Sequence, residues 1–256
     1  MIGRLEVIAL PNFPLVEPGD DLVAMICTAL AEGSLALASG DCLVVAQKIV
    51  SKSENRYAYY RDVSPSEAAV ALAEKVCKDP CMVQLILDES VEVLRHRPGA
   101  VIVEHRQGYV HANAGIDQSN IESDPADRRV LLLPLDADKS AQNLRLALQE
   151  TTGVEHLNIV ISDSAGRAWR NGIVGYAIGT AGFEPVVDEV GSKDLFGRPL
   201  EITQVAVADE LAAAASLLMG QAANAMPVVL IRGAPLQPSE KGSRELIRAK
   251  AQDLFR

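Results

Sequence analysis

Polar residues that follow apolar runs give this chain the chemistry needed to bind a charged ligand. Asp163 and Ser164 come directly after the predicted strand at residues 158–162, and Arg167 and Arg170 follow them closely. Because a carboxylate and a hydroxyl at the end of a strand can hold a hard divalent cation against phosphate oxygens, this segment is a candidate metal site. A strand-end turn in which Asp163 accepts backbone hydrogen bonds explains the segment alone equally well.

Two other segments offer complementary groups. Residues 111–120 contain Asp117 and side-chain amides, and small residues there would let a ligand approach the backbone. A polar loop without a binding role is, however, the commoner interpretation of such a segment. Residues 46–52 place Lys48 and Lys52 at the end of a predicted strand, where ammonium groups can bind phosphate. A solvated basic pair is the simpler interpretation of these two lysines.

The common signatures of nucleotide and hydrolase sites are absent from the sequence. It contains no Gly-x4-Gly-Lys-Ser/Thr loop, no Gly-x-Gly-x2-Gly opening a helix and no Gly-x-Ser-x-Gly. The four histidines show no metal-ligand spacing. An active site must therefore be assembled from acids, amides and lysines on several separate loops.

Composition limits the class of protein. With 256 residues, of which 48% are hydrophobic, the chain can bury one or two substantial cores. Its formal net charge of -10 argues against a nucleic-acid partner, whose phosphates need clustered Lys and Arg. We expect the four cysteines to be buried thiols in a reducing cytosol rather than a zinc site. Without a signal-like start or an apolar run of roughly 18 residues, we expect a cytoplasmic protein with no membrane contact.

The elements that must position these groups alternate without a regular period. Apolar runs and turn signals predict strands at residues 5–10, 41–50, 100–104, 109–112, 130–133, 158–162 and 227–231. Helical spacing and capping signals predict helices at residues 20–31, 64–78, 81–94, 141–152, 205–219 and 240–255. Ser64 is the predicted cap of the second helix, with Glu67 completing a capping box.

These elements predict an α+β (mixed α/β) class. Since no linker-like tract interrupts the chain, we expect a single unit over residues 1–256. A split into two lobes stays open. The loop at residues 188–199 is the richest candidate boundary, but it is too short to be a true linker.

Read in order, several segments resemble the coenzyme F-420 gamma-glutamyl ligase family. The resemblance covers residues 5–233, and the combination of Asn-Ala-Gly-Ile-Asp (113–117) with Gly-Arg-x2-Arg-Asn-Gly (166–172) makes it specific. It also includes Leu-Pro (10–11), Glu-Pro-Gly-Asp-Asp-Leu (17–22), Ala46 with Ser-Lys (51–52), Ser-Asn (119–120), Ser-Asp (162–163) and Val-Ala-Asp-Glu (207–210).

The resemblance implies an unusual fold, an intertwined homodimer and a GTP-dependent ligase. It implies that GTP activates the lactyl carboxylate of a deazaflavin precursor as an acyl phosphate, which the amine of L-glutamate then attacks. Phosphorylation supplies the leaving group that a free carboxylate lacks. The resemblance also implies two divalent metal ions, Mg or Mn. Whether a potassium ion binds as well is left open. Additional gamma-linked glutamates are also left open.

Site residues follow from the same resemblance. It implies that Asp117 and Asp163 are ligands of one metal ion and that Ser164 is a ligand of a second. At the second ion, Gln221 occupies the position where the family usually has a glutamate ligand. A neutral amide binds a cation less strongly than a carboxylate. The implied nucleotide contacts are Phe13, Pro14, Leu15, Val16, Gln47, Lys48, Lys52, Asn120, Met219 and Gly220. We infer that Arg167 and Arg170 stabilise the acyl phosphate or substrate carboxylates, with an exposed surface pair as the alternative.

Two other functions compete with this one. In a flavin- or deazaflavin-binding oxidoreductase, the same loops would bind the cofactor, with no metal or nucleotide needed. The 4% aromatic content disfavours it, because such rings are often packed against aromatic side chains. A non-catalytic binding protein of the same fold is the third interpretation.

Overall fold

Burial along one apolar run explains the centre of the fold. In the computed structural model, which describes residues 3–255, strand β2 (Cys42–Ala46) sends Leu43 and Val45 into one core and Cys42 and Val44 into another. The predicted two-sided burial is confirmed, because a strand covered on both faces needs no polar positions. The predicted strand at 41–50 was too long, since helix α2 (Gln47–Ser53) begins directly after Ala46.

Within the described residues, β2 belongs to a six-stranded sheet, called here the main sheet, in the order β1-β12-β2-β8-β9-β13. Its other strands are β1 (Glu6–Ala9), β12 (Val228–Arg232), β8 (Asn158–Arg167), β9 (Arg170–Phe183) and β13 (Pro238–Ser239). Strands β2 and β8 run parallel with Ala46 opposite Ser162, and the other neighbours are antiparallel. The residues that follow, Gln47 and Asp163, therefore lie together at one edge.

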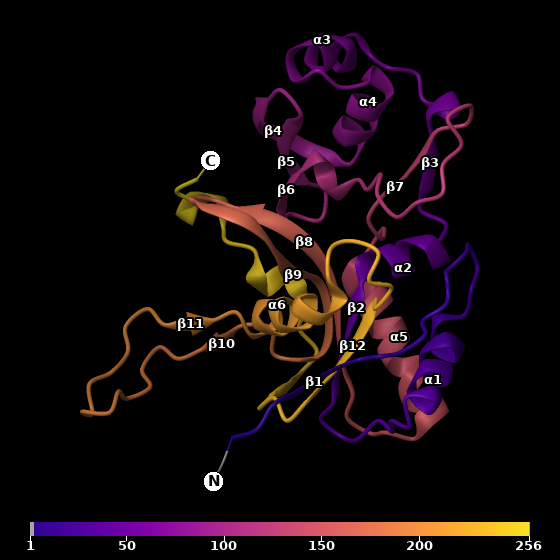
Figure 1. The fold of residues 1–256 in the computed structure, drawn as a ribbon. Helices are drawn as coiled ribbons and strands as arrows, with labels where there is room; N and C mark the ends of the chain where they lie inside the picture. The colour runs from indigo at the N-terminus through magenta and orange to yellow at the C-terminus, as the bar shows by residue number, and fades with distance from the viewer. Residues whose placement is uncertain (1–2, 256) are drawn as a thin grey trace.

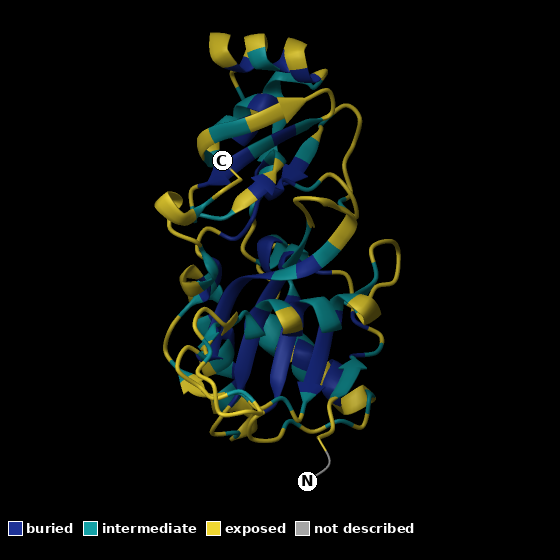
Figure 2. Ribbon diagram, turned by 90° about the vertical axis from the view of Figure 1, so that its left-hand side faces the viewer, coloured by how far each residue is buried: buried dark blue, intermediate teal, exposed yellow. Residues whose placement is uncertain are grey.

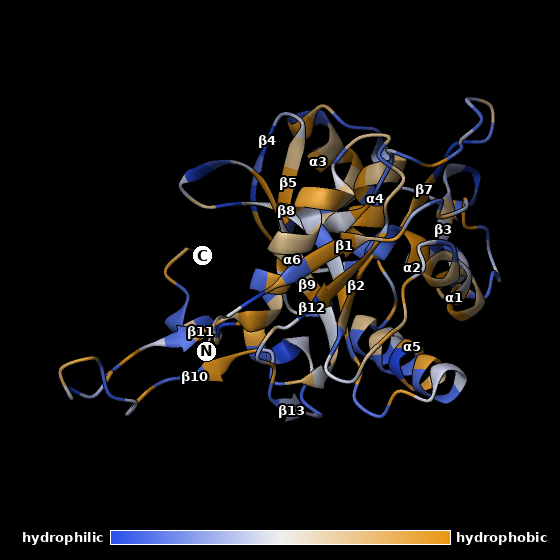
Figure 3. Cartoon of the chain, turned by 60° about the horizontal axis from the view of Figure 1, so that its bottom comes forward, coloured by the Kyte–Doolittle hydropathy of each residue, from blue (hydrophilic) through white to orange (hydrophobic). Residues whose placement is uncertain are grey.

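Helices cover both faces of the main sheet. Helix α6 (Val207–Met219) packs on one face, while α1 (Leu22–Glu32) and α5 (Ala137–Thr152) pack on the other (Figure 1). The side chains of Asp21 and Asp136 accept hydrogen bonds from the first backbone amides of α1 and α5, as N-caps do. Figure 3 shows β2 as hydrophobic and much of α5 as hydrophilic, which fits a central strand buried under amphipathic helices.

A second lobe stands on the main sheet (Figure 2). It comprises α3 (Glu67–Val76), α4 (Pro80–Asp88), β4 (Ser90–Arg97), β5 (Ala100–His105) and β6 (Val110–Ala112). Its own core gathers Val83, Ile86, Val101, Val103 and Ala114. The short strands β3 (Tyr57–Tyr59) and β7 (Arg129–Leu131) pair beside it.

The region after Ser162 differs most from the prediction. Strand β8 continues through Arg167, so Asp163 and Ser164 lie within a strand, and the long strand β9 was not predicted at all. A Cβ added at Gly175 would meet the carbonyl oxygen of Ala212 in α6 at 2.5 Å, and one at Gly179 would collide with the backbone of Ala137. Glycine is therefore required here for the helices to approach the strand.

The predicted helix at 240–255 was wrong. The segment forms only the 3-10 turns η3 (Ser243–Leu246) and η4 (Lys250–Gln252). The hydroxyl of Ser243 donates to the carbonyl oxygen of Ile178 on β9 at 2.9 Å, and the ammonium of Lys250 lies 2.6 Å from the carboxylate of Glu104 on β5. Anchors on two different sheets hold the chain in this irregular path, and this tertiary effect overrides its helical pattern.

Smaller corrections concern the second lobe. Helix α3 is capped by Ser66 instead of Ser64 and ends before Cys77, whose φ is 54°. The helix predicted at 81–94 ends at Asp88, because β4 begins at Ser90. The strands predicted at 5–10, 100–104, 109–112, 130–133 and 227–231 and the helices at 20–31, 141–152 and 205–219 are confirmed, with shifted ends.

Two further features lie at the surface. Strands β10 (Val187–Asp188) and β11 (Gln204–Val205) begin an arm that extends from the body (Figure 1). The four cysteines are free thiols; Cys42 is buried as expected, whereas Cys77 is exposed. Across residues 3–255, no helix is both long enough and apolar enough to cross a membrane.

Candidate active site

A pocket of about 550 Å³ opens where β2 ends beside the middle of β8. Its wall combines an N-terminal loop, the start of α2, the loop before β7, both long strands and the loop after α6. Every residue predicted for the nucleotide or a metal lies on this wall: Phe13, Pro14, Leu15, Val16, Gln47, Lys48, Lys52, Asp117, Asn120, Asp163, Ser164, Met219, Gly220 and Gln221. The fold therefore brings together residues from distant segments.

Asp117 is positioned by a strained piece of backbone. Asn113, Ala114 and Gly115 have φ values of 52°, 55° and 68°, a left-handed conformation that non-glycine residues rarely adopt. Beyond them, the amide of Asp117 donates to the carbonyl oxygen of Leu131 at 2.9 Å, and the amide of Leu131 donates back at 3.0 Å. The surrounding structure thus fixes the backbone that carries this carboxylate, as is common where strain is kept at a functional site.

The carboxylate of Asp117 meets α2. The ammonium of Lys48 lies 2.7 Å from its Oδ1, and the amide of Gln47 donates a hydrogen bond to its Oδ2. The Oγ of Ser51 donates to Oε1 of Gln47 at 3.0 Å and so fixes the orientation of that amide. Burial raises the pKa of Asp117, the Lys48 charge opposes this, and the nearby charge of Asp163 adds to it.

Asp163 faces the pocket from β8. Its Oδ1 accepts from the amide of Ser164 at 2.7 Å, and its Oδ2 lies 2.9 Å from Nε2 of His111. The other ring nitrogen of His111 lies 3.0 Å from the carbonyl oxygen of Ala112. Because both nitrogens face acceptors, the geometry favours an imidazolium. Burial by itself would lower the pKa of His111, but the hydrogen bond and charge of Asp163 raise it above its ordinary value.

His111 was not among the predicted site residues. The sequence showed it only as the first residue of a polar loop, and its contact with Asp163 joins strands of two different sheets. A pairing between such distant segments leaves no local signal in spacing or composition.

The remaining wall residues surround the mouth of the pocket. Lys52 lies one turn beyond Lys48 on α2, and burial lowers its pKa, as do the charges of Lys48 and Arg129, while Glu17 opposes this. The side-chain amide of Asn120 donates to the carbonyl oxygen of Ala222 at 3.3 Å. That bond connects the loop before β7 to the loop after α6.

Gly220 ends α6 with a φ of 67°, where an added Cβ would collide with Asn224. Gln221 comes next and is exposed on the pocket wall. This sharp turn at Gly220 directs the following loop over the pocket mouth.

The structure does not bring Arg167 and Arg170 into the pocket. Both are exposed near the turn between β8 and β9, and Nη1 of Arg167 donates to the carbonyl oxygen of Gly172 at 3.1 Å. Their predicted role in stabilising substrate charge stays a prediction.

The oxygen atoms on the wall suit a hard divalent cation. Asp117 and Asp163 supply carboxylates and Ser164 a hydroxyl, on the same pocket as Lys48 and Lys52. Within residues 3–255, no group of three His, Cys, Asp or Glu side chains could hold a metal ion by itself. The donor set thus matches a Mg²⁺ site that one or two carboxylates share with phosphate oxygens of a ligand.

Comparison with known proteins shows which family the chain resembles. A family model described as F420-0:Gamma-glutamyl ligase matches residues 12–233. The chain is 46% identical over 254 residues to "Coenzyme F420:L-glutamate ligase" of Methanothermobacter thermautotrophicus, covering 98% of this chain and 99% of that protein. Proteins of the same name from Archaeoglobus fulgidus and Methanocaldococcus jannaschii are 40% and 39% identical, over 99% of this chain and 97% of each protein.

Proposed function

The chain belongs to the F420-0:gamma-glutamyl ligase family, and on that premise we propose that it joins L-glutamate to a deazaflavin coenzyme F420 precursor at the expense of GTP. The observation that carries the proposal is the convergence of two lysines and two aspartates on one pocket wall. Lysines suit phosphates and aspartates suit the cation that accompanies them. No membrane or nucleic acid is needed as a partner.

The nucleotide occupies this pocket in the proposal. Lys48 and Lys52 offer ammonium groups to the phosphates, and Asn120 offers an amide. The loop of residues 13–16 and the loop after Gly220 provide backbone and apolar contacts on opposite sides. Charge-assisted hydrogen bonds of this kind are about twice as strong as neutral ones, so the lysines should contribute much of the affinity.

The metal would be held by Asp117 and Asp163, with Ser164 and Gln221 beside a second ion. A Mg²⁺ or Mn²⁺ ion held there would supply positive charge that offsets the negative charge developing during phosphoryl transfer. In the absence of an ion, Lys48 offsets the charge of Asp117, and His111 does so for Asp163. These contacts hold both carboxylates in place in the metal-free state. Potassium is a further ion to be tested.

The proposed reaction has two transfers. A carboxylate oxygen of the precursor attacks the γ-phosphorus, and the bond from that phosphorus to the β,γ-bridging oxygen breaks, so that GDP leaves. The uncharged amine of L-glutamate then attacks the acyl carbon, the bond from that carbon to the phosphate oxygen breaks, and the amine releases a proton to solvent. Lys48 and Lys52 would orient the phosphates for in-line attack.

A homodimer is part of the proposal. Trp169 at the turn between β8 and β9 is 88% exposed, and Leu195 and Phe196 in the arm are 99% and 84% exposed. Large apolar side chains exposed to this extent favour an interface. The hairpin of β8 and β9 projects from the main sheet (Figure 1), so a dimer would also give Arg167 and Arg170 a way to reach a neighbouring pocket. Sedimentation velocity measures the mass directly.

The function is tested by substrate dependence. The protein is incubated with Mg²⁺ or Mn²⁺ and GTP, and phosphate release is measured with the precursor, with L-glutamate, with both and with neither. We expect release only when both are present, together with a product heavier than the precursor by one glutamyl unit. Mass spectrometry also counts any further glutamates. Glutamylation that proceeds without GTP or metal would contradict the proposal, and so would a flavin-type redox reaction in place of ligation.

A further inference from the structure

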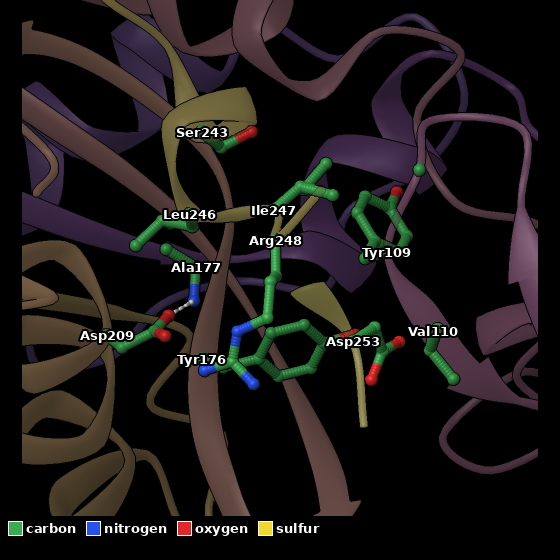
Figure 4. A pocket seen from close by; sticks show the side chains of 11 residues that line it. Tyr109, Val110, Tyr176, Ala177, Asp209, Ser243, Leu246, Ile247, Arg248 and Asp253 are labelled. Carbon is green, nitrogen blue, oxygen red and sulfur yellow. Dashed lines mark hydrogen bonds between the residues drawn. The ribbon is translucent and has the colours of Figure 1, made fainter. Parts of the chain in front are cut away.

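A second cavity, of about 260 Å³, lies beside β9 and beneath the C-terminal segment (Figure 4). It shares no lining residue with the pocket described above. Its lining includes Tyr109, Tyr176, Asp209, Ser243, Arg248 and Asp253. Neither the proposed nucleotide nor the proposed metals use it.

Two tyrosine hydroxyls mark this cavity as a binding site. The hydroxyl oxygens of Tyr109 and Tyr176 are buried, yet among the described residues neither has a hydrogen-bond partner. Both rings stand on the cavity wall in Figure 4. Because nearly all buried polar groups in folded proteins are paired, two unpaired hydroxyls at one cavity point to a ligand that pairs with them.

Opposite charges also line the cavity. Arg248 reaches from the C-terminal segment toward Tyr176 (Figure 4), and it makes no ion pair within residues 3–255. Asp209, on α6, accepts the amide of Ala177 at 2.9 Å, but in the same described part of the chain no Lys, Arg or His side chain pairs with it. A guanidinium suits a carboxylate, and a half-buried carboxylate suits an ammonium. The two together fit a small molecule that carries both, which is the pattern of an amino acid.

The cavity adjoins the candidate active site. Tyr176 stands opposite Asp163 in the register of β8 and β9, and its ring centre lies 5.7 Å from that of His111. Gly175, the preceding residue, lines the first pocket. The contacts from Tyr176 to His111 and from His111 to Asp163 thus connect the wall of this cavity with the candidate active site.

We propose that this cavity binds the L-glutamate that the ligase adds. Arg248 and the hydroxyls of Tyr109 and Tyr176 bind its carboxylates, and Asp209 attracts its ammonium before the amine is deprotonated and reacts. The inference rests on the proposed function, because it identifies where one substrate of that reaction is held.

The test separates glutamate from the other substrates. Kinetics are measured for Arg248→Gln and Tyr176→Phe, with Arg244→Gln as the matched control, since Arg244 is an exposed arginine of the same segment outside the cavity. We expect Arg248→Gln to raise the KM for L-glutamate roughly 10- to 100-fold and Tyr176→Phe to raise it about 3- to 10-fold. The KM values for GTP and the precursor should stay the same in both variants, and Arg244→Gln should match the parent protein.

Failure of this inference is distinguishable from failure of the proposed function. If the parent protein ligates glutamate and both variants keep its KM for glutamate, the cavity is not the glutamate site. If the parent protein ligates nothing, the proposed function fails, and calorimetry with L-glutamate alone decides the cavity. If the parent protein binds L-glutamate and Arg248→Gln does not, the result supports the site. If the parent protein does not bind L-glutamate, the result overturns it.

Discussion

The imidazole of His111 and the carboxylate of Asp163 lie 2.9 Å apart, buried between β6 of the second lobe and β8 of the main sheet. The contact ties the two sheets together at the wall of the candidate active site. It also orients a carboxylate whose other oxygen accepts the amide of Ser164.

This contact should contribute to stability. Replacing His111 by Phe keeps a ring of similar size but leaves the buried carboxylate of Asp163 without that partner. We expect the free energy of unfolding to fall by about 2 kcal/mol, the usual effect of leaving a buried polar group unpaired. Urea denaturation with EDTA present, so that no metal contributes, measures it. His156→Phe, at an exposed histidine, is the matched control. Equal unfolding midpoints for both variants would show that the contact is not stabilising.

Replacing Asp163 by Asn should nearly abolish turnover while leaving the fold intact. The amide keeps the shape of the carboxylate but removes the charge that a hard cation needs, so we expect kcat to fall roughly 100-fold or more. Circular dichroism checks the fold, and the rate is measured at saturating Mn²⁺. Near-normal activity under those conditions would contradict the assignment of Asp163 to a metal.

Lys52→Ala should weaken nucleotide binding and spare binding of the deazaflavin substrate. Lys52 lies on the pocket wall, and losing one charge-assisted hydrogen bond should raise the dissociation constant for GTP about 10- to 100-fold. Calorimetry measures both ligands. Lys75→Ala, at an exposed lysine on α3, is the control and should bind GTP like the parent protein. Unchanged GTP affinity in Lys52→Ala would remove this residue from the nucleotide site.

Much of the fold could be predicted because local patterns agreed with it. The run at 42–46 indicated a strand buried on both faces, and the glycine after residue 152 marked the end of α5. Strand β9 was missed because its glycines lower strand propensity, although they are needed where α5 and α6 approach. The C-terminal segment has a helical pattern, but its contacts with two sheets leave only two 3-10 turns.

The candidate site could likewise be predicted only in part from the sequence. Its nucleotide and metal residues could be proposed from a resemblance that spans the chain, and the structure places them on one pocket. His111 could not be proposed, because its partner lies in another sheet. The cavity beneath residues 243–253 is likewise formed by the tertiary packing of four distant segments, which leaves no pattern in any one of them.

Gln221→Glu should strengthen the second metal site. Gln221 stands on the pocket wall just after the turn at Gly220, and a carboxylate offers a full charge where the amide offers only a dipole. We expect a lower Mn²⁺ or Mg²⁺ concentration at half-maximal rate, with GTP held constant. Gln118→Glu, outside the pocket, is the control and should not shift the curve. Superimposed titrations for Gln221→Glu and the parent protein would show that this position does not contact a metal.

The central claim is that GTP drives the ligation by phosphorylating the precursor's carboxylate. Isotope transfer tests it most directly: the carboxylate is labelled with oxygen-18, the complete reaction is run with Mg²⁺ and L-glutamate, and the released phosphate is analysed by mass spectrometry. Because the acyl carbon–oxygen bond breaks in the second transfer, the account predicts that each phosphate released from fully labelled precursor carries one oxygen-18 atom. Unlabelled phosphate released alongside a glutamylated product would contradict it.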